Sequence, residues 1–299
     1  MDGERTKKKA RKGAKTQRNA EWSAVEMPCV RRVKYKRNQI DMRSPGEGRK
    51  LSSARALAPS EALDMRRASP LDEAAMPLKY GIFITFEGSE GCGKTTQIQR
   101  LAARLEKAGQ AVLTTREPGG TPLGESIRHL LKFAEEGKDM TPEAELLLFA
   151  ASRAQLVKEV IGPALAAGTW VIADRFMDST TVYQGVARRL DYEAVRMINE
   201  FVVGERQPDL IFVLDLDLEE ARRRLRRRPR PVGAPDRMEQ MPPAFYEAVR
   251  EGYLTLARND AARFRVIQAG RSADAIEEEI WEQVEQVEQV KQARGLMGK

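Results

Sequence analysis

The fold of this chain is decided by one stretch of sequence, Gly88-Ser89-Glu90-Gly91-Cys92-Gly93-Lys94-Thr95. The stretch fits G-x-x-x-x-G-K-[ST], the pattern of a phosphate-binding loop. Its glycines let the backbone take turns that a Cβ would block, so that successive N–H groups can point at a phosphate. Lys94 is predicted to reach the β- and γ-phosphates of ATP, and the Thr95 hydroxyl to hold Mg²⁺. All eight residues are therefore candidate ATP-binding residues.

The sequence on either side of this loop supports the interpretation. Residues 81–87 form an apolar, β-branched run that predicts a buried strand. Residues 96–108 predict a helix that carries Ile98, Leu101 and Leu105 on one face and stops at Gly109. Strand, glycine loop and helix are the setting that the motif requires, which disfavours a plain glycine turn with an incidental Lys-Thr pair.

The rest of the chain alternates predicted strands and helices. Further strands are expected at 111–114, 169–173, 210–216 and 264–267. Helices are expected at 124–133, 142–160, 191–203, 218–227 and 243–257, and from about Ala273. Nearly continuous apolar strands are typical of a parallel sheet covered on both faces. We therefore expect an α/β protein of the P-loop NTPase fold, with a five-stranded parallel sheet and helices on both faces.

Charge is spread unevenly along the 299 residues. Residues 1–75 hold 19 basic and 10 acidic side chains, whereas the remainder holds 32 basic and 34 acidic ones. The formal net charge of +7 therefore comes from the first 75 residues, and the body lacks the charge typical of nucleic-acid binding. We expect residues 1–75 to be a largely disordered extension. There are two alternatives. Residues 1–75 could be a basic arm that contacts nucleic acid, or translation could begin at Met76.

Composition excludes several classes of protein. The two cysteines, Cys29 and Cys92, cannot form a disulfide framework, and Cys92 lies inside the loop, which suits a reducing cytoplasm. We find no apolar run long enough to span a membrane and no secretory signal. His129 is the single histidine, so zinc sites and histidine-based triads have little material.

Two further motifs follow predicted strands. Asp174-Arg175 comes directly after the 169–173 strand, at the carboxyl end where open α/β sheets bind ligands. An aspartate there can hold Mg²⁺ and an arginine can bind a second phosphate, although a surface ion pair would look the same. The run Arg-Glu-Pro-Gly-Gly-Thr at 116–121 forms a tight loop with one charge, which by itself indicates a turn.

Residues 222–230 hold seven arginines in nine positions. Like charges at i and i+4 of a helix are mutually destabilising, so an anion is expected to offset them. Arginine also stabilises charge on a transferring phosphoryl group. A mobile, arginine-rich lid over about 222–238 explains this segment, and a basic patch that binds RNA is the alternative.

Taken together, five blocks resemble bacterial thymidylate kinase in order and spacing. They are residues 86–96, 115–121, 149–156, 174–185 and 208–215. The resemblance covers about residues 77–283. It implies a P-loop nucleotide kinase domain over 76–283, a helical or frayed tail over 284–299, and a homodimer. It further implies phosphoryl transfer from ATP to dTMP with Mg²⁺, giving dTDP and ADP.

The resemblance also implies roles for individual residues. Lys94 and loop 88–95 match the donor-phosphate site, and Glu90 matches the carboxylate that contacts the sugar 3′-hydroxyl. On the acceptor side, the resemblance assigns thymine stacking to Phe149, base-edge recognition to Arg153, the acceptor phosphate to Arg116 and Arg175, and the surroundings of base and sugar to Thr180 and Tyr183. Thr95 and Asp174 are the candidate metal residues.

In this family, a glutamate at position 90 goes with catalytic arginines supplied by the lid. The candidate catalytic residues are Lys94, Arg175, Arg224, Arg226 and Arg228. The chain departs from the family at Pro229, where a glycine is usual, which leaves the choice among the lid arginines open.

Other functions compete with this interpretation. A second P-loop kinase could act on another nucleoside or nucleotide, and a P-loop switch ATPase would hydrolyse ATP without an acceptor. An RNA-binding protein would use residues 1–75 and show a steep salt dependence. The expected partners are dTMP, ATP and a second copy of the chain, with no membrane and no required nucleic acid.

Overall fold

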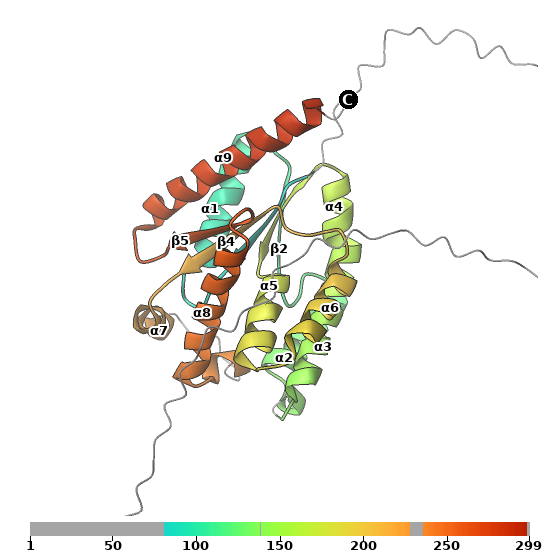
Figure 1. Ribbon diagram of the computed structural model, residues 1–299, viewed down its shortest axis with the longest axis vertical. Coiled ribbons are helices and arrows are strands. Elements are labelled where there is room, and N and C mark those ends of the chain that lie inside the picture. Colours follow the sequence, from blue (N-terminus) through green and yellow to red (C-terminus); the bar gives the residue numbers. More distant parts are fainter. Residues whose placement is uncertain (1–80, 138, 228–235, 298–299) are drawn as a thin grey trace, which may run out of the picture. The chain divides into compact units, whose positions relative to one another are not determined.

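The computed structural model describes residues 81–137, 139–227 and 236–297 (Figure 1). The predicted basic extension over 1–75 lies outside this part of the chain. So do Arg228, Pro229 and most of the second half of the predicted arginine-rich lid. Among the described helices, none is long and apolar enough to cross a bilayer.

Five parallel strands form one sheet, as predicted. They are β1 (Phe83–Glu87), β2 (Val112–Arg116), β3 (Trp170–Asp174), β4 (Leu210–Asp215) and β5 (Phe264–Gln268). The spatial order is β2-β3-β1-β4-β5, which places β1 at the centre. Thr85 of β1 lies opposite Ala173 of β3 on one side and Ile211 of β4 on the other. The phosphate loop therefore leaves the middle of the carboxyl edge, between the ends of β3 and β4.

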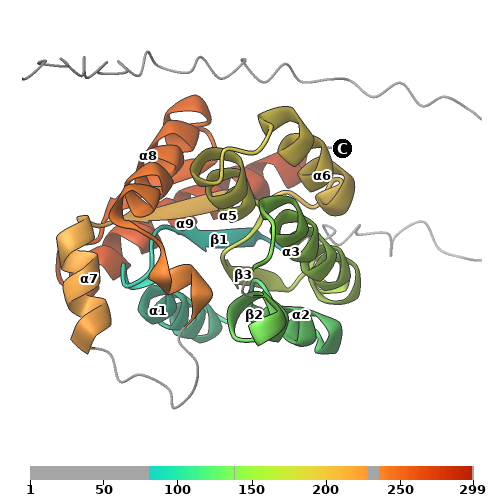
Figure 2. The ribbon, with the colours of Figure 1, turned by 90° about the horizontal axis from the view of Figure 1, so that it is seen from below.

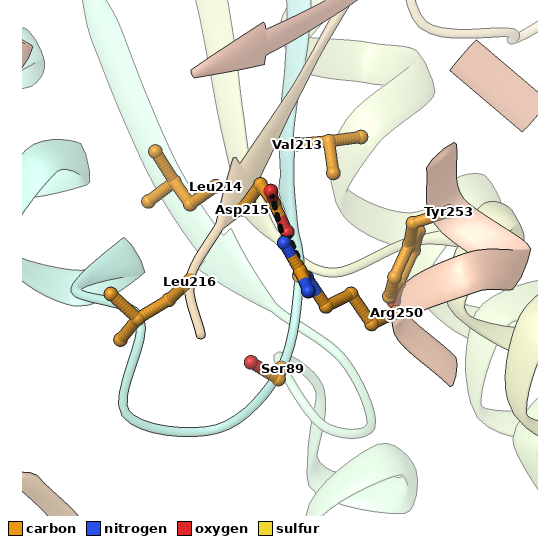
Figure 3. A pocket seen from close by; sticks show the side chains of 8 residues that line it. Ser89, Val213, Leu214, Asp215, Leu216, Arg250 and Tyr253 are labelled. Atoms are coloured by element: carbon orange, nitrogen blue, oxygen red, sulfur yellow. Dashed lines mark hydrogen bonds and ion pairs between the residues drawn. The ribbon is translucent and has the colours of Figure 1, made fainter. Parts of the chain in front are cut away.

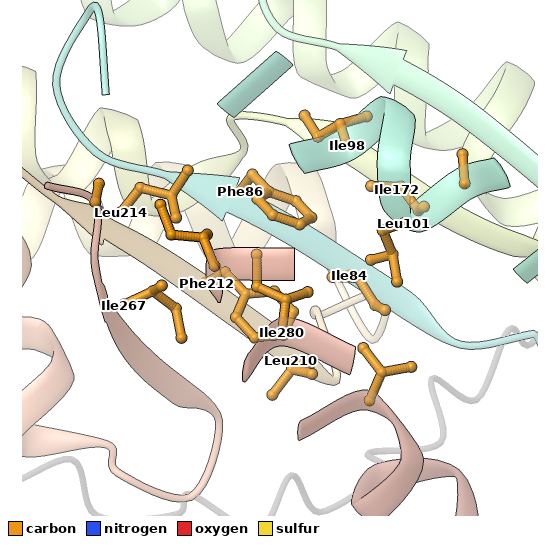
Figure 4. Packing of buried hydrophobic residues seen from close by; sticks show 14 of the residues in the cluster. Ile84, Phe86, Ile98, Leu101, Ile172, Leu210, Phe212, Leu214, Ile267 and Ile280 are labelled. Carbon is orange, nitrogen blue, oxygen red and sulfur yellow. The ribbon is translucent and has the colours of Figure 1, made fainter. Parts of the chain in front are cut away.

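Two helices cover one face of the sheet. They are α1 (Lys94–Lys107) and α9 (Ala273–Met297), which pack against each other as well as against the strands. Ile84 and Phe86 of β1 and Phe212 of β4 are fully buried between the sheet and these helices (Figure 4). Burying a side chain of this size contributes about 1.5–3 kcal/mol, so the central strand and the helix after the loop are held rigidly together.

The other face is covered by helices that lie between α1 and α9 in the sequence, and Figure 2 shows α5, α6 and α8 on the side of the sheet opposite α1. The remaining helices are α2 (Pro122–Lys132), α3 (Pro142–Leu156), α4 (Gly162–Ala166), α5 (Met177–Thr180), α6 (Tyr192–Val203), α7 (Leu218–Arg227) and α8 (Pro243–Asn259), with short 3₁₀ turns η1 (Glu135–Gly137) and η4 (Arg237–Gln240). α8 follows η4 directly and packs on the segment between α5 and α6.

The structure adds two helical features to the expected elements. The predicted 142–160 helix continues to Ala166 through a π-helical stretch, η2 (Val157–Ile161), ahead of Pro163, which lacks the N–H that a regular turn would use. A second π-helical stretch, η3 (Thr181–Ala187), continues α5 where no helix was expected. Threonines and Gly185 give this segment low intrinsic helix propensity. Burial of Val182 and Tyr183 against α8 accounts for its helical form.

Candidate active site

The phosphate loop has the backbone that the motif predicts. Gly88 and Gly91 have φ values of 125° and 80°, in the region that favours glycine. A Cβ on Gly88 would lie 2.6 Å from the carbonyl oxygen of Leu214, and one on Gly91 would lie 2.8 Å from that of Ala221. The loop is therefore packed tightly against the end of β4 and against α7, and two of its glycines are required by contact as well as by conformation.

Lys94 begins α1 and is largely buried. Its Nζ donates hydrogen bonds to the carbonyl oxygens of Gly88, at 3.1 Å, and Ser89, at 2.8 Å. These bonds hold the ammonium group within the loop, where a bound phosphate would be in reach of its charge.

The two candidate metal residues lie side by side. The Thr95 hydroxyl donates to Oδ2 of Asp174 at 3.3 Å, although the residues come from α1 and the end of β3. A hydroxyl and a carboxylate suit Mg²⁺, which prefers oxygen ligands and usually takes only one or two from the protein. The residues present therefore fit the ion that the loop motif implies.

Glu90, Arg175 and Tyr183 meet next to the loop. Oε1 of Glu90 lies 2.9 Å from Nη2 of Arg175, and the Tyr183 hydroxyl donates to Oε2 of Glu90 at 3.1 Å. The Arg175 guanidinium also lies over the Tyr183 ring, 5.0 Å from its centre. Burial acts to raise the pKa of Glu90, but the charges of Arg175 and Lys94 outweigh it and lower that pKa. The carboxylate is thus ionised between the two cations.

Arg153 lies deeper than the sequence suggested, with only 1% of its surface exposed. Its Nε and Nη2 both bond the Glu117 carboxylate, at distances down to 2.6 Å. Nη1 donates to Oδ1 of Asn199 at 2.9 Å, and Nη2 also donates to the Thr180 hydroxyl at 2.8 Å. The structure therefore joins two predicted acceptor-site residues, Arg153 and Thr180, in a buried network with two partners that sequence reasoning missed.

Phe149 lies on α3, one turn before Arg153, and is half-buried. Residues four apart share a helix face, so the predicted stacking residue and the buried arginine point the same way. Recognition of the thymine by these two residues stays a prediction.

Arg116 and Arg128 lie close enough to each other and to Asp174 for their charges to interact. Arg116 is exposed and its Nη2 bonds both oxygens of Glu125 at 3.0 Å. Arg128, on α2, donates from Nη1 to the Pro118 carbonyl at 2.9 Å. Burial, and then the positive charge of Arg116, lower the pKa of Arg128. Sequence reasoning missed Arg128, because a helical arginine seven positions after a tight loop carries no local sign that it lies near Asp174.

The lid arginines are only partly within the described residues. Arg224 of α7 donates from Nε to Glu220 at 2.8 Å and from Nη2 to the Ala269 carbonyl at 3.2 Å. Arg226 is exposed at the end of the same helix, and Arg228 lies outside the described residues. Which of these arginines is catalytic stays open.

A parallel sheet of this order, with a phosphate loop after the central strand and an Asp-Arg pair after its neighbour, defines a nucleotide kinase of the P-loop NTPase fold. The family model described as "Thymidylate kinase" matches residues 86–280. The chain belongs to the thymidylate kinase family.

Individual relatives agree with this assignment. A thymidylate kinase of Deinococcus radiodurans is 47% identical over 207 residues, which cover 69% of this chain and 98% of the relative. One from Halothermothrix orenii is 48% identical over 204 residues, covering 68% and 96%. The solved thymidylate kinase of Ehrlichia chaffeensis matches with a TM-score of 0.54 and 33% identity, covering 68% of this chain and 98% of that one.

Proposed function

We propose that this chain phosphorylates dTMP with ATP, giving dTDP and ADP, at the site between loop 88–95 and the residues that follow β3. Its family and the named relatives support this reaction. The observation that carries the proposal is the contact of Glu90 with Arg175 and Tyr183. These contacts bring a carboxylate, a guanidinium and a hydroxyl together beside the donor loop, a set of polar groups that suits a second ligand and that a switch ATPase would not need.

On the donor side, Lys94 and the loop backbone bind the phosphates of ATP. Thr95 and Asp174 would hold Mg²⁺, which would neutralise charge on the phosphate oxygens. Among the described residues of the lid segment, Arg224 and Arg226 are the candidates that stabilise the transferring group.

On the acceptor side, Arg175 and Arg116 bind the phosphate of dTMP. Arg128 adds a third cation close to Arg116 and Asp174. Phe149 stacks on the thymine, because stacking suits any flat π face. Tyr183 lies against Glu90, so a nucleotide whose 3′-hydroxyl bonds Glu90 would have little room for a 2′-hydroxyl beside the ring. Arg153, one turn after Phe149 on the same helix, is assigned to the base edge through its match to the family.

A homodimer is part of this proposal, and an apolar patch on α3 and α6 supports it. Phe201 is 90% exposed and Met197 55% exposed on α6, and Leu147 of the adjoining α3 is 57% exposed. Exposed aromatic side chains in such a group are typical of a protein interface. Sedimentation of Phe201→Glu should give a monomer, with Val266→Glu, an exposed apolar residue of β5, as the control that stays dimeric.

The free, buried Cys92 inside the loop supports a reducing, cytoplasmic location.

The test of the reaction is ADP release from ATP with dTMP, compared with dUMP, dCMP, dGMP and AMP. We expect dTMP to give the highest kcat/KM. ADP release at the same rate without any acceptor would support the switch ATPase instead. A higher rate with another nucleotide would point to a kinase of different specificity.

A further inference from the structure

A fully buried carboxylate lies directly behind the acceptor arginine. Glu87 is the last residue of β1 and none of its surface is exposed. Its Oε1 accepts from the backbone N–H of Phe176 at 2.8 Å. Its Oε2 accepts from the hydroxyls of Ser179, at 2.6 Å, and Tyr253, at 2.9 Å. Glu87 thus receives three hydrogen bonds, two of them from hydroxyl groups.

The same two hydroxyls face Arg175. Nη1 of Arg175 donates to the Ser179 Oγ and to the Tyr253 hydroxyl, each at 3.2 Å. Tyr253 comes from the middle of α8 and is 1% exposed, and the neighbouring Arg250 binds Asp215 at the end of β4 (Figure 3). α8 therefore reaches the acceptor site from a part of the chain 78 positions after Arg175.

The direction of the protons follows from the chemistry of the groups. A guanidinium only donates. The Glu87 carboxyl accepts from both hydroxyls in the structure, and burial raises its pKa against the opposing charge of Arg175. The Tyr253 hydroxyl donates a hydrogen bond to Glu87, and its oxygen therefore accepts from Nη1 of Arg175. Burial raises the pKa of Tyr253 far above its ordinary value, so the hydroxyl keeps the proton that this arrangement needs.

The position of the Arg175 side chain depends on contacts with its neighbours. Its φ of 71° is uncommon for a residue other than glycine. Its guanidinium is held on the Nη2 side by Glu90 and on the Nη1 side by the two hydroxyls. Ser179 is four residues from Arg175 and moves with the same segment, whereas Tyr253 fixes the guanidinium to a separate helix.

We propose that Tyr253 is a positioning residue for phosphoryl transfer: its hydroxyl, oriented by Glu87, holds the Arg175 guanidinium in place for the acceptor phosphate. This inference rests on the proposed role of Arg175. It goes beyond that role because it assigns a function in catalysis to α8, which contributes none of the residues predicted from the sequence.

The test compares Tyr253→Phe with Tyr246→Phe in the full chain. Both remove one hydroxyl from α8, and Tyr246 donates to the Met238 carbonyl at 2.7 Å. We expect Tyr253→Phe to lower kcat/KM for dTMP by about tenfold. A misplacement of about 1 Å can cost about a hundredfold, and the guanidinium keeps its contacts with Glu90 and Ser179. KM for ATP should stay unchanged, and Tyr246→Phe should match the wild type in both. An unchanged kcat/KM for dTMP in Tyr253→Phe would overturn the proposal.

A second comparison separates positioning from general structure. Affinity for dTMP is measured by calorimetry, which needs no turnover, in the wild type, in Tyr253→Phe, in Arg175→Ala and in the double variant. If Tyr253 acts through Arg175, the second substitution has no further effect. A further loss of the same size as in the wild-type background would overturn the inference. Unchanged kcat and dTMP affinity in Arg175→Ala itself would instead overturn the proposed role of Arg175.

Discussion

The donor side and the acceptor side of this site are built in different ways. The donor loop is eight consecutive residues whose backbone is set by its own glycines. The acceptor side is assembled from side chains of β1, α3, α5, η3, α6 and α8 and of the loops after β2 and β3. Its ion pair Arg153–Glu117 joins residues 36 positions apart. A substitution in the loop should therefore change the chemistry and leave the fold intact. A substitution in the buried acceptor network should change stability as well.

The largest effect is expected for Lys94→Ala. The cation acts mainly on charge in the transition state, so kcat should fall by about a hundredfold to a thousandfold. Thermal stability should change little, because the lost bonds go to backbone carbonyls at the edge of the loop. ADP release and thermal unfolding measure the two effects. Lys107→Ala, at the exposed end of the same helix, is the control. A loss of thermal stability in Lys94→Ala as large as that expected for the buried acceptor network would contradict the contrast between the two sides.

Arg153→Ala should show the opposite balance. Glu117 would lose its partner in a site where burial, against the charge of Arg153, raises the pKa of Glu117 to about 7. Breaking a buried pair from one side typically costs about 3–5 kcal/mol, which denaturant unfolding can measure. Use of dTMP should also fall more than ATP binding.

Phe149→Ala is the matched comparison on the same helix. The ring is half-buried and lacks the buried charge of Arg153, so its loss should weaken dTMP use by about 1–3 kcal/mol with a smaller loss of stability. Equal losses of ATP and dTMP affinity in either variant would contradict the acceptor-side assignment.

A smaller effect concerns Asp178, a buried carboxyl of α5 whose Oδ2 has no hydrogen-bond partner. Burial, and then the charge of Glu87, raise its pKa from 3.8 to about 7, against the charges of Arg263 and Arg153. The folded state therefore holds this proton more tightly than the unfolded state. The resulting stability is complete below the unfolded pKa and is lost as the pH rises through about 7.

Asp178→Asn tests this directly. The Tm of the wild type, measured by thermal unfolding, should be lower at about pH 8 than at about pH 5.5. The corresponding difference in Tm should be smaller in Asp178→Asn. Asp139→Asn, an exposed carboxylate after η1, is the control that should behave as the wild type. If Tm falls equally in Asp178→Asn and in the wild type between these two pH values, the Asp178 carboxyl is ionised at both. It would then contribute nothing to the pH dependence of stability.

Removal of residues 1–75 is expected to have no effect on activity or stability. The relative from Deinococcus radiodurans matches over 98% of its own length but only 69% of this chain, so it has no counterpart of that extension. A shortened chain starting at Met76 should keep kcat and Tm. A large loss of either would show that both sides of the site depend on residues outside the family domain.

How far the sequence predicts this protein can be followed in single elements. The 81–87 strand, the loop and the 96–108 helix were expected almost where β1 and α1 lie, because apolar periodicity and glycine conformation are local properties. The helix over 177–187 was missed, because burial of Val182 and Tyr183 overrides the low propensity of its threonines and Gly185. Arg128 and Tyr253 were missed because neither carries a local signal.

By itself, the sequence determined the phosphate loop, the parallel sheet and the family, since each depends on residue types at short or fixed spacing. Only the tertiary structure decided that Arg153 is held in a buried pair with Glu117, and that Glu87 and Tyr253 meet behind Arg175. The physical reason is that a buried charge needs a partner, and the partner's place along the chain is free as long as packing brings it near. A pattern of neighbours in sequence therefore specifies the donor loop, whereas the acceptor side exists only once the helices have packed on the sheet.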